Sequence, residues 1–123
     1  MIIDFQNMEE KPVECFKGGI GITNLRKFEN ELGKIILGRL EPGATIGLHT
    51  HETNSEAIYI VSGTADFIYD PDTESASDGA ADATVKYETV TAGSCHYCPK
   101  GHTHSMVNNS SEDIVFFAVI PEQ

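Results

Sequence analysis

Short apolar and β-branched runs, separated by turn residues, follow one another along most of this chain. Runs of this kind, bounded by Gly, Pro, Asn and Asp, are typical of β-strands. Many short strands with regular turn signals predict an all-β sandwich or barrel. Nine strands are predicted: Ile20–Leu25, Lys34–Leu40, Thr45–His51, Glu56–Ser62, Thr64–Tyr69, Ala83–Val90, Ser94–Cys98, Thr103–Val107 and Ile114–Ile120.

The segments between and before these runs set the organisation of the chain. Ser62 and Gly63 predict a tight hairpin between two runs. Leu25–Gly33 is the one stretch with any helical character, and its closing Gly limits it. Residues 1–19 are interpreted as an N-terminal arm that pairs with the sheet or with a second subunit, and residues 20–123 as one β-domain.

Residues 70–83 are compositionally different, because they are acidic, rich in Ala and Ser and almost free of apolar bulk. A loop at the end of a hairpin is the simplest interpretation. The alternating acids Asp70, Asp72 and Glu74 raise a calcium site as an alternative, although the glycine that an EF-hand loop needs is missing. A lid over a pocket is a further hypothesis.

The charge balance narrows the possible partners. Nineteen acidic against eight basic residues give a formal net charge of −11, which opposes binding to nucleic acids and to anionic lipid surfaces. No apolar run approaches the roughly 18 residues of a membrane span. The three cysteines are an odd number, which favours a reducing compartment. With no basic leader followed by an apolar run, we expect a cytoplasmic protein.

Two stretches carry the candidate chemistry. The first runs Gly43, five residues, His49-x-His51, four residues, Glu56, six residues, Gly63. The second runs Gly93, five residues, Pro99-x-Gly101, two residues, His104, three residues, Asn108. Together they supply three imidazoles and one carboxylate, which suit a divalent transition metal.

The ten identities in these two stretches, at their spacings, resemble the paired signatures of the cupin family. The resemblance implies a jelly-roll β-barrel, also called a double-stranded β-helix, in a single domain. It assigns ligand roles to His49, His51, Glu56 and His104, which would bind one divalent ion, with Mn, Fe, Ni, Co and Zn all open. It also implies a homodimer, in which Ile2–Phe5 could add a strand across the subunits.

Strand periodicity extends the predicted site. Side chains at i and i+2 share a face, so Ile58 and Ile60 are predicted to line the pocket beside Glu56. Met106 is predicted there for the same reason, beside His104. An apolar cavity around a metal is typical of a small organic ligand.

Five further residues allow two interpretations each. His102 is either a proton donor at the pocket mouth or a solvated turn residue. Arg39 either binds a substrate carboxylate or lies at the surface. His96 is predicted to support the site or the core rather than to bind the metal. Cys95 and Cys98 are either small core residues or a redox pair.

The leading hypothesis is a mononuclear metalloprotein that binds a small organic molecule at the metal. Iron chemistry would make it a dioxygenase, and Lewis-acid chemistry an isomerase or lyase. The alternative is a non-catalytic binding or sensing module, because fold does not determine function. A third possibility is a closed structural zinc site.

Overall fold

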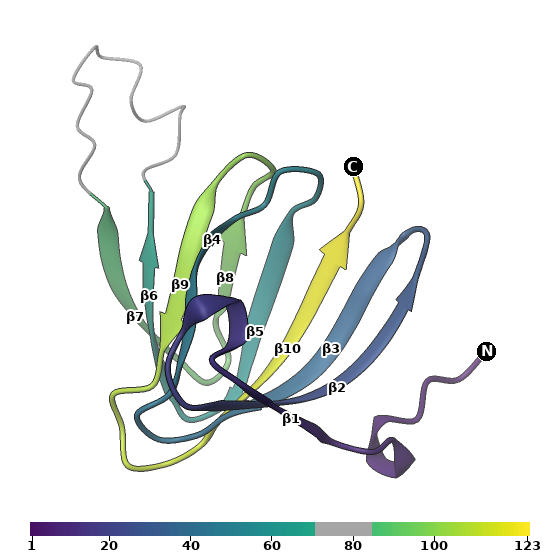
Figure 1. Ribbon diagram of the computed structural model, residues 1–123, viewed down its shortest axis with the longest axis horizontal. Coiled ribbons are helices and arrows are strands. Elements are labelled where there is room, and N and C mark those ends of the chain that lie inside the picture. Colours follow the sequence, from purple (N-terminus) through teal and green to yellow (C-terminus); the bar gives the residue numbers. More distant parts are fainter. Residues whose placement is uncertain (71–84) are drawn as a thin grey trace.

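The computed structural model describes residues 1–70 and 85–123, and most of the regular structure within them is antiparallel strand (Figure 1). Two 3₁₀ turns, η1 and η2, lie in the N-terminal segment, at Phe5–Asn7 and Phe16–Gly18. The strands are β1 (Lys11–Glu14), β2 (Ile22–Asn30), β3 (Gly33–Leu40), β4 (Thr45–Thr50), β5 (Glu56–Ser62), β6 (Thr64–Tyr69), β7 (Lys86–Thr91), β8 (Cys95–Cys98), β9 (Thr103–Val107) and β10 (Ile114–Pro121).

The strands form two sheets. One has six strands in the order β1-β2-β3-β10-β5-β8, and the other has four in the order β4-β9-β6-β7. Side chains from both sheets meet in one core, in which Leu40, Ile60 and Phe67 are fully buried. The all-β prediction is confirmed, and each of the nine predicted runs overlaps one strand of the described residues.

The helical interpretation of Leu25–Gly33 is wrong. This segment continues β2, which pairs residue by residue with β3 from Thr23↔Leu40 to Asn30↔Gly33. Pairing with a neighbouring strand outweighs the weak local preference for a helix. The hairpin closes at Gly33, where φ is +141°.

The N-terminal arm belongs partly to the sheet. β1 pairs antiparallel with β2 of the same chain, so the sheet-pairing interpretation holds for Lys11–Glu14. Ile2–Phe5 forms no strand: Phe5 begins η1, and its ring packs edge-to-face on Phe117 with the centroids 6.1 Å apart. Its pairing with a second subunit, like the homodimer itself, stays a prediction.

Two residues of the sequence motifs, Asn108 and Gly63, have structural roles. Asn108 is fully buried, and its side-chain amide donates to the carbonyl oxygens of Leu40 (2.9 Å) and Glu112 (2.8 Å). Gly63 adopts φ +89°, and an added Cβ would lie 2.6 Å from the carbonyl oxygen of Asp113. Both residues therefore fix loops at one end of the sheets and contribute no metal donor.

The acidic segment predicted as a loop lies outside the described residues, apart from Asp70. The calcium and lid hypotheses concern this segment, so they too fall outside the described residues. Within residues 1–70 and 85–123, no helix has the length and apolarity needed to cross a membrane.

Candidate metal centre and pocket

The fold brings the four predicted ligands together. Three of them lie on three different strands, and the fourth directly follows the end of a strand. His49 lies on β4 and is paired across the strands with His104 of β9, while His51 follows the end of β4. Glu56 begins β5, in the other sheet. One donor atom from each residue lies within 4.8 Å of all the others. This group spans the two sheets, and we call it the metal group.

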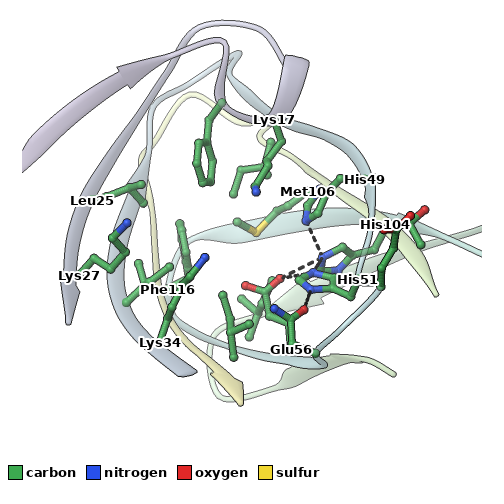
Figure 2. Close-up of a pocket in the computed structure, with 18 of the residues that line it drawn as sticks. Lys17, Leu25, Lys27, Lys34, His49, His51, Glu56, His104, Met106 and Phe116 are labelled. Carbon is green, nitrogen blue, oxygen red and sulfur yellow. Dashed lines mark hydrogen bonds and ion pairs between the residues drawn. The ribbon is translucent and has the colours of Figure 1, made fainter. Parts of the chain in front are cut away.

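The donor atoms of the metal group face one another (Figure 2). His104 Nε2 lies 2.9 Å from His51 Nε2, 3.2 Å from His49 Nε2 and 2.9 Å from Glu56 Oε1. Three imidazole nitrogens directed at one point repel one another unless a proton or a cation lies between them. The donor set therefore fits a divalent transition metal, which takes imidazole and carboxylate ligands.

Each imidazole of the metal group makes a hydrogen bond through its Nδ1, the ring nitrogen that does not face the other donors. His49 Nδ1 donates to the carbonyl oxygen of Gly47 (2.7 Å), and His51 Nδ1 to Asn54 Oδ1 (2.5 Å). His104 Nδ1 lies 3.1 Å from His96 Nε2. A carbonyl oxygen can only accept, so the proton of His49 is on Nδ1 and its Nε2 lone pair is free. Such contacts fix the tautomer and ring orientation of ligating histidines.

Burial and hydrogen bonding set the charges of two members of the metal group. It lowers the pKa of His49 to about 4, so this imidazole is neutral near pH 7. Burial opposes ionisation of Glu56, but hydrogen bonds to His104 and His51 outweigh it and lower the pKa of Glu56 to about 2. The site thus presents a neutral imidazole and an anionic carboxylate, the forms that bind metals.

A cavity of about 390 Å³ lies beside the metal group. Much of its wall is apolar, with Ile58, Met106 and Phe116 among the lining residues. Phe116 fits there because it lies on Gly38, where an added Cβ would be 2.2 Å from the ring. A concave, partly apolar site with a few charged groups is typical of small-molecule binding.

Comparison with known proteins agrees with this geometry. The model of the Cupin domain family matches residues 36–120, which include all four members of the metal group. The chain belongs to the cupin family. The jelly-roll architecture implied by its two motifs is therefore confirmed.

Two curated relatives are similar to this cupin over nearly its whole length. An oxalate-binding protein from Thermotoga maritima is 33% identical, over 98% of this chain and 93% of the relative. Oxalate decarboxylase OxdC from Bacillus subtilis is 31% identical over 96% of this chain, which spans 29% of that longer protein. A crystal structure from T. maritima, described as a predicted oxalate decarboxylase, shares the fold with a TM-score of 0.82 at 22% identity, and each chain is covered completely.

The predicted pocket residues divide into two groups. Ile58 and Met106 line the cavity as expected. Ile60 does not, because it is fully buried in the core two positions further along β5. Arg39 faces away from the cavity and pairs with Glu10 (2.7 Å) and Asp113 (3.0 Å). Arg39 therefore does not line this cavity, and its position agrees with the alternative of a surface Arg.

His102 lies outside the cavity as well. Its Nδ1 is 3.1 Å from Asp70 Oδ1, and it lines a second cavity of about 250 Å³. The two cysteines do not form a pair either: Cys95 is exposed and Cys98 is buried, and both are free thiols. Burial raises the pKa of Cys98 to about 12, which favours the interpretation of a core thiol over that of a redox pair.

The sequence did not predict that several charged residues line the cavity. Lys17, Lys27, Lys34 and Glu52 all line it. Alternation with Leu25 and Ile36 marks Lys27 and Lys34 as inward-facing, once the segment is recognised as a hairpin.

No local pattern in the sequence predicts that Lys17 lines the cavity. A close contact between the backbones of its turn and of β4 positions it there. Lys17 has φ +56° in η2, and its carbonyl oxygen would lie 2.1 Å from a Cβ on Gly47. Only a glycine at that position lets the turn lie so close to β4.

His96 supports the metal group, as the sequence suggested. Its ring is buried between Phe67, with the centroids 4.2 Å apart, and His104. We expect His96→Phe to weaken metal binding by about 10- to 100-fold, because His104 Nδ1 loses its acceptor. His96→Gln, which can accept through its amide oxygen, should restore most of the affinity. Competition with a metal chelator measures both variants, and equal affinities for His96→Phe and the wild type would contradict this role.

Proposed function

We propose that this cupin binds one divalent transition-metal ion through His49, His51, Glu56 and His104 and, at that ion, a small carboxylic acid. The observation that carries the proposal is the position of the metal group. Its donor atoms converge at the wall of a cavity large enough for a small molecule. A site that only stapled the fold would need no such cavity.

The charges around the cavity support an anionic ligand. Three of the eight basic side chains of the protein, Lys17, Lys27 and Lys34, line this one cavity, although the chain carries a net charge of −11. Ammonium groups in a partly apolar cavity attract an anion more strongly than the same groups in water. The two curated relatives are described as oxalate-binding and oxalate-decarboxylating, which favours a carboxylic acid over other anions.

Manganese is the metal that we propose. Four protein donors leave two positions of an octahedral ion for a ligand, and mixed nitrogen and oxygen donors suit manganese as well as iron, cobalt and nickel. The oxalate decarboxylase of B. subtilis is described with Mn(II) centres. Elemental mass spectrometry of the untagged protein distinguishes these metals from zinc.

Decarboxylation is the second candidate function, and one lining residue favours it. Cleavage of an oxalate-type acid into carbon dioxide and formate needs a proton delivered to the remaining carbon. Among the described residues, Glu52 is the only carboxylate besides Glu56 that lines the cavity, so it is the candidate proton donor. A bound divalent ion would supply Lewis-acid polarisation of the acid. Oxygen consumption by the iron-loaded protein would indicate the dioxygenase alternative instead.

Calorimetric titration of oxalate into manganese-loaded and metal-free protein tests the proposal. We expect binding to the loaded protein and none after chelation, because the ion provides the main anchor for the acid. Formate release in the same samples separates a decarboxylase from a binding protein, and Glu52→Gln should abolish release while leaving binding intact. Oxalate binding that is independent of the metal would refute the proposal, and so would the failure of the loaded protein to bind oxalate or any other small carboxylic acid.

A further inference from the structure

We propose that Lys27 and Lys34 form a second anion-binding subsite across the cavity from the metal group. The ligand would then be a dicarboxylic acid with a longer carbon chain than oxalate: one carboxylate at the metal and the other at the lysines. This inference rests on the proposed function, because it assigns the far end of the acid that binds the metal.

The first argument is the direction of the two side chains. Lys27 lies on the same face of β2 as Leu25, and Lys34 on the same face of β3 as Ile36, and all four line the cavity. The Lys27 and Lys34 side chains are 45% and 30% exposed, so they lie at the rim of the cavity, where an ammonium group can meet both solvent and a bound anion. Figure 2 shows both ammonium groups on the wall opposite the histidines of the metal group.

The second argument is incomplete charge pairing. Both ammonium groups lie near the same carboxylate, that of Glu29, at 3.6 Å for Lys27 and 3.7 Å for Lys34. One carboxylate balances only one of the two positive charges. The distances exceed those of ordinary hydrogen bonds, so ammonium protons remain available to a ligand. Glu29 is half exposed and is not among the residues that line the cavity, so the excess charge is open to an anion inside it.

The third argument is the surface between the two charged ends. Ile36, Ile58 and Phe116 line the cavity together with the metal group and the lysines. Apolar walls favour methylene groups, and oxalate has none. Oxalate held at the metal would therefore make little use of the apolar wall between the two charged ends. A diacid with several methylene groups uses the apolar wall and reaches both charged ends.

The test compares acids that differ in one end group. Manganese-loaded protein is titrated with oxalate, succinate, glutarate and adipate, and with butyrate, pentanoate and hexanoate as monoacids of matched length. We expect at least one longer diacid to bind at least about tenfold more tightly than its matched monoacid, which corresponds to about 1.4 kcal/mol. The double variant Lys27→Met/Lys34→Met should remove this difference, so that each diacid binds no more than about twofold more tightly than its matched monoacid.

A matched control removes two lysines elsewhere. Lys11→Met/Lys100→Met lowers the net charge equally, outside the cavity, and should retain the preference for the diacid. If oxalate binds but no longer diacid exceeds its monoacid, the subsite is refuted and the proposed function stands. The same holds if the preference survives Lys27→Met/Lys34→Met. If no acid binds the loaded protein, both proposals fail. The comparison of acids in the wild type decides the question even if the double variant does not fold.

Discussion

His104→Ala should lower the affinity of the protein for Mn²⁺ by at least about 100-fold, more than the loss of any residue that only supports a ligand. His104 Nε2 lies within 3.2 Å of a donor atom of each of the other three members of the metal group. Its removal therefore opens the centre of the group rather than its edge. The metal content after dialysis, measured by elemental mass spectrometry, should fall from near one ion per chain to background.

His102→Ala is the matched control, since the same residue type is removed two positions away. His102 is buried, as is His104, but it contacts Asp70 and lines the second cavity. This variant should retain its metal, and far-ultraviolet circular dichroism should show that both variants keep the β-fold. Full metal occupancy of His104→Ala, or equal loss in both variants, would contradict the assignment of the metal group.

Phe67→Ala should reduce the free energy of unfolding by about 3–5 kcal/mol, the range for deleting a large aromatic side chain from a packed core. Phe67 is fully buried on β6 and packs on His96, which in turn contacts His104. The cavity left behind is lined by core residues of both sheets, so little of it can close. Urea denaturation of the metal-free proteins measures the effect without the contribution of metal binding.

Phe67→Leu separates the loss of volume from the loss of stacking. We expect it to recover a large part of the unfolding free energy, because most of the core volume is refilled. Metal affinity should stay below that of the wild type in both variants, since neither side chain can stack on His96. A loss of less than about 1 kcal/mol in Phe67→Ala would show that this part of the core is not packed as described.

Much of the metal group could be predicted before the fold was known. His49 and His51 are close in sequence, and Glu56 follows after a short loop, so local geometry already brings three donors near one another. The spacing around His104 added the fourth through the resemblance to cupins. His96 was also assigned correctly, because it lies on a strand next to the ligands without occupying a motif position.

The pocket residues were harder to predict. The alternation of side chains between the two faces of a strand explains both the correct predictions and the errors. Ile58 and Met106 follow from the alternation of side chains along a strand. Ile60 obeys the same alternation but lies too deep in the core to line the cavity. Alternation predicts which face of the sheet a side chain is on, but not how far along the strand the cavity extends. Arg39 faces outward beside its inward-facing neighbour Leu40 and is satisfied by acids from distant parts of the chain.

The sequence by itself determined an all-β fold, because strand periodicity is a local property, and the resemblance of its two motifs to those of cupins indicated the four candidate metal donors. Only the tertiary structure decided the composition of the rest of the cavity. Lys27 and Lys34 enter it because β2 extends into a hairpin with β3, against the weak local preference of that segment. Lys17 enters because Gly47 lets a distant turn approach β4. Such contacts join residues that no local pattern connects, and they depend on how the two sheets pack.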